Sequence, residues 1–289
     1  MYDVIQELLA NIKAGATFKD AIARHPKVFP TYWTHLIEAG EVSGSLPKVL
    51  SQLAKNMEAT EELRKKVITA MVYPAILIAA SLGAVIFFMV AIVPIFAKLF
   101  ASFNAELPFI TKAVLSFSAF LQKQILVIIA ISAGSFYWFR RFIRSPKGLQ
   151  MFQIMLLKLP VFGGATSDVI HARIGITLSM LIRSGLSFLK SLEITANVSG
   201  NYIFQTAINH VRLEVQQGKT LSAALSEHTI FSPMLVNLVK IGEEGGKLPE
   251  MIEKASDYFV LRVDTFTNRI SVVIEPIIMI LVGGVIGMI

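Results

Sequence analysis

The sequence contains no cysteine, which excludes disulfide bonds, thiolate-bound zinc, iron–sulfur clusters and a cysteine nucleophile. Charge is also scarce, because 16% of the 289 residues are Asp, Glu, Lys or Arg, whereas 54% are hydrophobic and the mean hydropathy is +0.63. That composition is too apolar for an ordinary soluble domain. The sequence therefore predicts an integral membrane protein in which histidines, carboxylates or hydroxyls are the remaining groups for chemistry.

Catalytic and metal-binding patterns are missing as well. The five histidines form neither an H-x-x-x-H pair nor an H-E-x-x-H motif, and there is no G-x-S-x-G nucleophile elbow. We expect the histidines to be solvated or to cap helices. Residues 242–248 superficially resemble a phosphate loop, but the spacing is one residue short, Leu248 replaces the magnesium-binding hydroxyl and two acids would repel phosphate. We therefore predict no catalytic residue, no metal site, no cofactor and no enzyme activity.

The positive charge of the chain is placed beside its apolar segments. The formal net charge is +7, from 27 basic and 20 acidic residues. Most of this excess lies on or next to apolar stretches, where it orients a membrane protein, and not on a soluble face that could follow a phosphate backbone. Nucleic-acid binding is therefore not expected.

Three apolar segments are candidates for membrane spans. Residues 67–97 carry no charge over 31 positions, and about 20 apolar residues cross the hydrocarbon core. A second span is predicted within 118–142, where residues 125–139 are apolar and Lys123 would reach toward an interface. The third, 270–289, contains Glu275 near its start.

The basic residues around these spans predict their direction. They lie before the first span and after the second, and the intervening loop has few: Arg64, Lys65, Lys66, Arg140, Arg141, Arg144 and Lys147. By the positive-inside rule, the loop around 95–117 is external. Residues 1–66 and 143–269 are then two cytoplasmic helical domains, 67–142 hold the first two spans, and 270–289 form a third, truncated span.

The chain contains an internal repeat with an offset of 202 residues. Of the 50 positions aligned without a gap from Phe29 and Phe231, 11 are identical, and both copies carry the element G-E-x-x-G-x-L-P. With one residue of gap, 15–25 also matches 218–228. The sequence therefore predicts two copies of one helical domain, each leading into a membrane helix, with the second span bringing the chain back between them.

Local signals divide the second copy into six helices, because glycines and prolines punctuate its apolar periodicity. The expected boundaries are Gly185, Ser187, Gly200, Gly218, Thr220, Ser232, Gly242 and Pro249. The first copy contains the last four helices, and the alignment places its missing start about 34 residues before Met1. We expect a fragment trimmed at both ends. The predicted fold is an all-α membrane protein with two repeated cytoplasmic six-helix bundles, the first reduced to four helices, and three transmembrane helices.

The G-E-x-x-G-x-L-P element is the main candidate site. Its first glycine is expected to end a helix in the left-handed conformation, its second to relieve the turn, and its proline to begin the next helix. The glutamate has two interpretations. It accepts backbone N–H groups at the start of the following helix, or it faces a partner. The candidate partner-binding residues are Gly40, Glu41, Gly44, Gly242, Glu243, Glu244 and Gly246.

A second pair of candidate positions lies at the membrane entrances. Tyr73–Pro74 and Glu275–Pro276 are equivalent in the repeat. An acid in a membrane segment is a functional hypothesis, here contact with a partner protein or with a moving helix. Alternatively, Glu275 accepts bonds from groups freed by the proline or pairs with Arg269. Arg173, on an apolar stretch, is expected to be a charge on a helix surface or, as the less common alternative, one half of a buried pair with an acid of the bundle.

These motifs in this order resemble the type II secretion system F family. The resemblance rests on both G-E-x-x-G-x-L-P elements, the two entrances, and four further segments: Val93–Phe96, Glu106–Leu121, Leu159–Gly164 and Ala172–Arg173. It implies an inner-membrane platform protein of a type II secretion or type IV pilus machine, which couples a cytoplasmic assembly ATPase to extraction and polymerisation of pilin or pseudopilin subunits.

The resemblance also implies partners and a location. The partners are that ATPase, the (pseudo)pilins, other inner-membrane assembly proteins and the lipid bilayer. A homo-oligomer is expected, because such a bundle would seat a ring. The location is the bacterial inner membrane, with several crossings and both helical domains in the cytoplasm. The alternative is a membrane transporter or channel subunit built from a parallel repeat, which solute flux in liposomes would reveal.

Overall fold

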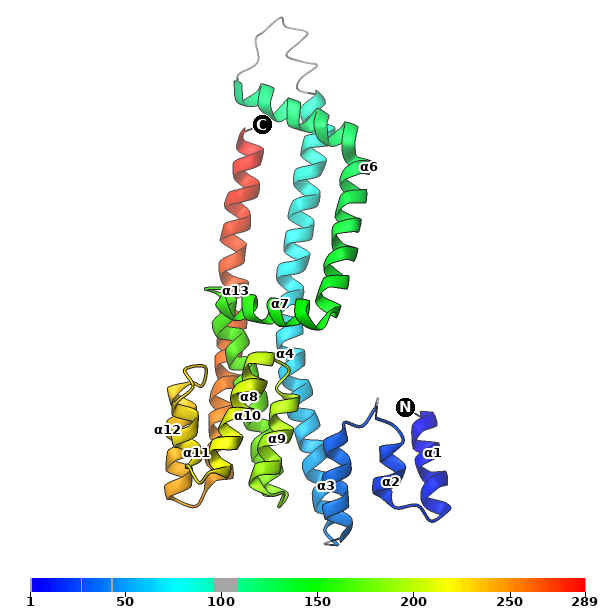
Figure 1. Cartoon of the computed structure of the whole chain (residues 1–289). Helices are drawn as coiled ribbons and strands as arrows, with labels where there is room; N and C mark the ends of the chain where they lie inside the picture. The colour runs from blue at the N-terminus through cyan, green and yellow to red at the C-terminus, as the bar shows by residue number, and fades with distance from the viewer. Residues whose placement is uncertain (1, 27, 43, 96–108, 289) are drawn as a thin grey trace, which may run out of the picture. The chain divides into compact units, whose positions relative to one another are not determined.

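A computed structural model describes residues 2–26, 28–42, 44–95 and 109–288. Within these ranges the chain is helical and contains no strand, which confirms the predicted all-α class (Figure 1). The helices of the first part are α1 (Tyr2–Lys13), α2 (Phe18–Ala23), α3 (Thr31–Val42), α4 (Leu46–Phe87), the π segment η1 (Phe88–Ile92) and α6 (Phe109–Arg144). The remainder are α7 (Pro146–Lys158), α8 (Phe162–Arg183), α9 (Phe188–Val198), α10 (Tyr202–Gln216), α11 (Leu221–Ser226), α12 (Pro233–Glu244) and α13 (Leu248–Met288).

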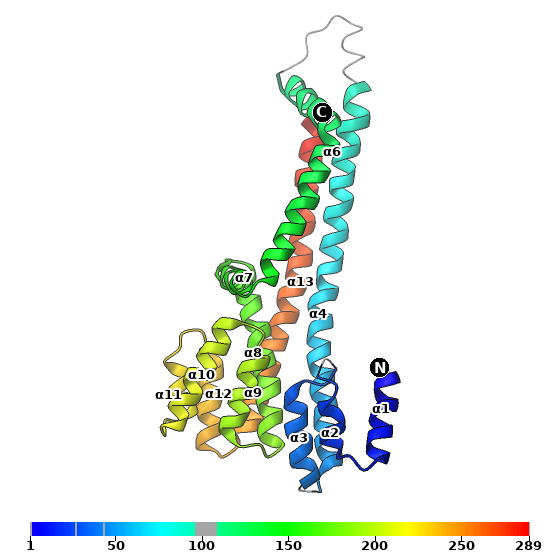
Figure 2. The ribbon, with the colours of Figure 1, turned by 45° about the vertical axis from the view of Figure 1, so that its right-hand side comes forward.

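The chain divides into two compact units. Residues 1–64 and 153–263 form the first, and residues 65–152 and 264–289 form the second. Within the first unit, α1–α3 and residues 46–64 of α4 are called the first helix set. The second helix set comprises α8–α12 and residues 248–263 of α13. Figure 2 shows α3 beside the first turns of α4, and α8 and α9 beside α10.

The first helix set is built on a small apolar core. Its buried side chains come from all four helices, and α8 and α9 of the second set add three more. They are Leu8, Ala21, Ile22, Leu36, Ile37, Val49, Leu53, Met180, Leu181 and Ile194. Burial of such side chains is the main source of stability in a short helical bundle, because helices of this length are marginal alone.

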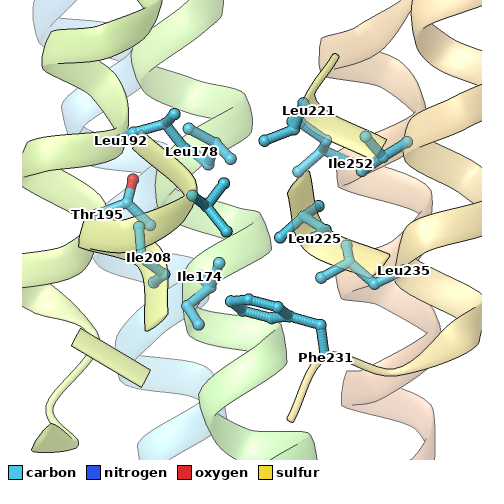
Figure 3. Close-up of a pocket in the computed structure, with 12 residues that line it drawn as sticks. Ile174, Leu178, Leu192, Thr195, Ile208, Leu221, Leu225, Phe231, Leu235 and Ile252 are labelled. Carbon is cyan, nitrogen blue, oxygen red and sulfur yellow. The ribbon is translucent and has the colours of Figure 1, made fainter. Parts of the chain in front are cut away.

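The second helix set encloses a larger apolar interior. Side chains of α8–α13 point toward a common centre, among them Ile174, Leu192, Ile208 and Ile252 (Figure 3). Thr195 is polar, but its hydroxyl donates to the carbonyl of Ser191 at 2.7 Å and needs no other partner. The centre is therefore a packed core and not a site for a polar ligand.

Helix boundaries in the second set follow the signals in the sequence. The Thr220 hydroxyl caps α11 by accepting from the N–H of Ala223, and Ser232 caps α12 with Pro233 in its first turn. Gly185 and Gly218, which follow α8 and α10, have φ of 81° and 95°, values that favour glycine. The predicted helix boundaries at Thr220, Ser232, Gly185 and Gly218 are confirmed. The predicted helix end at Gly242 is not, because α12 continues to Glu244.

The second unit contains two helical irregularities. The π segment η1 precedes Pro94, and the Ser118 hydroxyl donates to the Met89 carbonyl within that segment at 2.5 Å. Wide π turns leave carbonyls available for such side-chain bonds. Gln124 of α6 has non-helical angles, φ −116° and ψ 16°. This kink separates Lys123 from the apolar residues that follow, so the regular helix runs from residue 125 to Arg144.

In the part of the chain that the structure describes, two helical stretches are long and apolar enough to cross a membrane, Leu46–Ile95 and Leu248–Gly284. They contain residues 67–95 of the predicted first span and residues 270–284 of the predicted third span. The predicted second span falls within α6 and stays a prediction. Most of the predicted external loop lies outside the described residues, since residues 96–108 are not among them.

Candidate functional site

The carboxylate of Glu41 holds the start of a short helix. It accepts hydrogen bonds from the backbone N–H groups of Phe18 at 2.7 Å and Lys19 at 3.3 Å. The hydroxyl of Thr17 accepts from the next N–H, that of Asp20, at 3.1 Å. The first three N–H groups of α2 would otherwise lack partners within the helix. All three are therefore satisfied, two of them by a charged acceptor.

Glu243 makes the same arrangement in the second helix set. Its carboxylate accepts from the N–H groups of Leu221 at 2.5 Å and Ser222 at 2.9 Å, while Thr220 accepts from Ala223. A negative charge at a helix N-terminus is also favoured by the helix dipole. We call each of these a glutamate clamp.

The glutamate clamps correct one expectation from the sequence. The glutamates were expected to cap the helix that follows them, but each binds the short helix that precedes it, α2 or α11. The reason is geometric, because the following helices begin with Leu46 and Leu248 after a turn that has its own backbone bonds. The clamp ties each short helix to the turn at the end of α3 or α12.

The second glycine of each element occupies the strained position of the turn. Gly44 and Gly246 have φ of 69° and 66°. The N–H of Ser45 bonds to the Gly40 carbonyl at 2.8 Å, and that of Lys247 bonds to the Gly242 carbonyl at 2.9 Å. The N–H groups of Gly44 and Gly246 also bond to the carbonyls of Glu41 at 3.2 Å and Glu243 at 3.4 Å, so both copies form a Schellman motif.

The first glycine of each element has a different role from the one expected. Gly40 and Gly242 were expected to end their helices in the left-handed conformation, but both lie inside α3 and α12. A Cβ on Gly242 would approach the Cα of Leu248 to 2.9 Å, and one on Gly40 would approach the Val49 side chain to 3.0 Å. These glycines are required because the next helix crosses here at close range.

The predicted partner-binding residues thus fall into two groups. Gly40 and Gly242 are covered by the next helix, and the Glu41 and Glu243 carboxylates are engaged with backbone. The three others are exposed on the turns: Gly44, Glu244 and Gly246. Contact with a partner at these turns stays a prediction, and its accessible part is this exposed group.

The predicted membrane-entrance residues lie on the two long helices. Tyr73 and Glu275 are exposed on α4 and α13, and both helices continue through Pro74 and Pro276. Among the described residues, no ion pair joins Glu275 to Arg269. Their roles at a membrane entrance stay predictions.

The sequence patterns did not predict that one histidine, His171, is buried. His171 of α8 is 2% exposed and lies among Phe204, Phe231 and Phe259, the last stacked on it at 4.6 Å. Its Nε2 accepts from the N–H of Ser232 at 3.1 Å, so Nδ1 carries the proton and donates to the Ser167 carbonyl at 2.8 Å. Burial is the main cause that lowers the pKa of His171 to about 4.

The burial of His171 could have been found from spacing. It precedes Ile174 and Leu178 by three and seven residues, and so shares their apolar face. The prediction that the histidines are solvated is therefore wrong for His171, because this histidine is buried. It supports an N-cap residue of α12 from within the core.

Two further charges of α8 stabilise the second helix set. Asp168, which is buried, pairs with Arg262 of α13 at 3.1 Å, and burial raises the pKa of the Asp168 carboxyl while Arg262 opposes that rise. Arg173 was expected on the helix surface or in a buried pair with an acid. Instead its guanidinium donates to the Ser199 carbonyl at the end of α9 at 3.4 Å, and burial lowers its pKa. A cation there stabilises the helix C-terminus.

These features place the described part of the chain in a class of all-helical proteins. Two of its apolar helices are long enough to cross a membrane, and each follows a turn that carries a glutamate clamp. Comparison with known families then gives a more specific result. The family model described as "Type II secretion system (T2SS), protein F" matches residues 1–94 and 176–289. The chain belongs to this family.

Relatives agree with the family match. The type IV pilus assembly protein PilC of Myxococcus xanthus is 35% identical over 287 residues, which are 98% of this chain and 68% of that protein. PilC of Thermus thermophilus is 32% identical and covered to 71%, and 99% of this chain is aligned. The type II secretion system protein F of Aeromonas hydrophila is 30% identical, over 98% of this chain and 74% of that protein. The suspected family is thus confirmed.

Proposed function

We propose that this chain is an inner-membrane platform of a type IV pilus or type II secretion machine. In this proposal it couples a cytoplasmic assembly ATPase to the extraction and polymerisation of pilin or pseudopilin subunits. The names of its relatives support the machine, and the structure supports the mechanical part. Two copies of a helical domain lie in the cytoplasm, and three helices cross the membrane.

The observation that carries the mechanical part is the continuity of α4 and α13. Each begins at a clamped turn and continues as one helix into an apolar stretch that could span a bilayer. Lys66 of α4 and Asp264 of α13 form an ion pair at 3.0 Å near the start of these stretches. A continuous helix passes on a rotation or tilt applied at one end, so force from a motor at the turns would reach the membrane.

The turns supply a surface for the motor to contact. Gly44, Glu244 and Gly246 are exposed, and the backbone beneath them is fixed by Schellman bonds and glutamate clamps. A rigid, exposed turn at the base of each long helix is suited to receive force. A crosslinker placed at Glu244 is expected to capture the assembly ATPase.

A break in the lever tests the proposal. Asn268 and Arg269 are exposed on α13, and each glycine in a helix costs about 1 kcal/mol relative to alanine. Replacing both by glycine should abolish pilus assembly or secretion in the native host, while the protein still inserts. The matched variant with two alanines removes the same side chains and keeps the helix, so it should retain assembly. Equal assembly in both variants would contradict the lever.

Self-association is the remaining part of the proposal. Tyr2, Ile5, Leu9 and Ile12 form an exposed apolar stripe along α1, with exposed fractions between 41% and 73%. Exposed apolar stripes of this kind are typical of interfaces. We expect Leu9→Lys to reduce the mass of the detergent-solubilised assembly, measured by light scattering, and Lys13→Glu to leave it unchanged.

A further inference from the structure

The end of α6 carries a face of cations without acids. Arg140, Arg141 and Arg144 lie on one side of its last two turns together with Tyr137, and these residues with Ser145 line a shallow hollow. All three arginine side chains are exposed. Residues 107–167 contain seven Lys and Arg residues and no Asp or Glu. Within the described part of this stretch, therefore, no neighbouring carboxylate neutralises the hollow.

The corner after the hollow is rigid. The Ser145 hydroxyl accepts from the Gly148 N–H at 3.1 Å and donates to the Phe142 carbonyl at 2.7 Å. A Cβ on Gly148 would lie 2.0 Å from that carbonyl oxygen, so only glycine fits. Phe139 of α6 also meets Phe152 of α7 edge to face at 6.1 Å. The start of α7 is thereby fixed to the end of α6, and Arg144 is held next to the corner.

The surroundings of the hollow are those of a membrane interface. The apolar run 125–139 precedes it, and the exposed aromatic residues Tyr137 and Trp138 lie at the end of that run. Along α7 the exposed residues follow helical spacing, with apolar side chains between two lysines: Lys147, Met151, Ile154, Met155 and Lys158. An apolar stripe between cations is typical of a helix lying in the interface, with the lysines reaching toward the headgroups.

We propose that Tyr137, Arg140, Arg141 and Arg144 bind the phosphodiester headgroup of an anionic phospholipid. Guanidinium groups match phosphate oxygens in bidentate geometry, and the Tyr137 hydroxyl can donate to the same group. The occupant we propose is a lipid and not a free anion, because the hollow adjoins the exposed apolar residues of α6 and α7, which an acyl chain would cover. The site rests on α6 crossing the membrane, as the proposed topology requires.

The two tryptophans of the chain, Trp33 and Trp138, make the test direct. In a Trp33→Phe background, Trp138 is the remaining tryptophan and lies next to the hollow. The full chain is reconstituted in vesicles that contain either brominated phosphatidylglycerol or brominated phosphatidylcholine, because bromine quenches a neighbouring tryptophan. We expect phosphatidylglycerol at low mole fraction to be about tenfold more effective, as three cations at an anionic surface allow.

Variants separate the site from general charge. In the R140Q/R141Q/R144Q variant, both lipids should quench Trp138 equally. That quenching would also show that Trp138 remains at the interface. K13Q/K240Q/K254Q removes the same charge from exposed positions elsewhere and should keep the preference. An unchanged preference for phosphatidylglycerol in the arginine variant would overturn the site. Equal quenching by the two lipids in the Trp33→Phe protein that keeps its three arginines would also overturn it.

Two further outcomes identify the cause of a failure. Loss of the preference on adding inorganic phosphate would show an ion site and overturn the lipid as occupant. No quenching by either lipid would place α6 outside the bilayer and overturn both the topology and this site. Quenching without a preference overturns the lipid site alone and leaves the platform proposal in place.

Discussion

The first and second helix sets have the same turn geometry, but they differ in how many of their apolar side chains are covered by neighbouring helices. Both have the glutamate clamp and the Schellman motif. In the second set Ile208 is 3% exposed and Phe259 fully buried, because α8 and α9 pack over this side. The aligned residues Ile5 and Met57 of the first set are 49% and 51% exposed. Turn geometry is therefore encoded within each copy, whereas burial depends on which helices pack against it.

Truncation of aligned side chains should separate the two sets most strongly. Phe259→Ala is expected to cost about 4 kcal/mol, because it leaves a cavity beside His171, whereas Met57→Ala should cost about 0.5 kcal/mol or less. Chemical denaturation of the full chain in detergent, with hydrogen exchange to assign the loss to each set, measures both. Equal costs would mean that Met57 is covered in the assembled protein.

Acid should destabilise the second set specifically. The pKa of His171 is about 4 when folded and about 6.5 when unfolded, so below pH 6.5 the unfolded chain binds a proton that the folded chain does not. Stability is lost as pH falls from 6.5 to 4, by about 3 kcal/mol at most. Asp168 acts in the opposite direction, because its pKa is raised in the folded state.

His171→Gln supplies the control for the acid effect. A glutamine does not titrate, so its unfolding free energy should depend less on pH between 6.5 and 4. Hydrogen exchange of α10–α13 at pH 5 and pH 7 reports the loss, and α1–α3 serve as the internal reference. A pH dependence unchanged by the substitution would contradict the role of His171.

Removal of a clamp should affect both sets alike. Glu243→Ala and Glu41→Ala each leave two N–H groups without their charged acceptor and should each cost about 2 kcal/mol, since water partly replaces the lost bonds. The neighbouring Glu244→Ala removes an exposed carboxylate and should change stability by about 0.5 kcal/mol or less. Stability of the three variants from denaturant titration tests the comparison. A large cost for Glu244 would place the structural role at the wrong carboxylate.

The smallest expected effect is at the left-handed glycines. Gly44→Ala and Gly246→Ala should each cost about 1 kcal/mol from backbone conformation, since a Cβ there meets no atom within 4 Å. Gly164→Ala is the matched control, because that glycine is helical with open space around it and alanine is the better helix former. Thermal unfolding should move in opposite directions for the two kinds of site.

Much of this architecture was accessible from sequence because its signals are local. The caps at Thr220 and Ser232 and the glycines after α8 and α10 lie within a few residues of the boundaries they set. The repeat in the sequence also aligns the two turns with each other. Local chemistry of this kind predicts where helices begin and end.

The remaining features depend on contacts distant in sequence. Glu243 binds N–H groups 21 and 22 residues away, so its helix could not be chosen from the motif alone. Gly242 is required by the approach of α13, which a helix-ending rule does not consider. Arg173 finds its carbonyl 26 residues later. In each case the sequence motif names the residue, but its structural role depends on packing.

Single-cysteine labelling tests the central claim most directly, because the chain has no cysteine of its own. Ser51→Cys and Gln217→Cys place thiols at exposed positions of the first and second sets, and Ser102→Cys places one in the predicted external loop. With a membrane-impermeant maleimide on intact spheroplasts, position 102 should react, and positions 51 and 217 should react only after permeabilisation. Labelling of either position 51 or position 217 from outside would contradict the claim that both helix sets lie in the cytoplasm and continue into membrane-spanning helices.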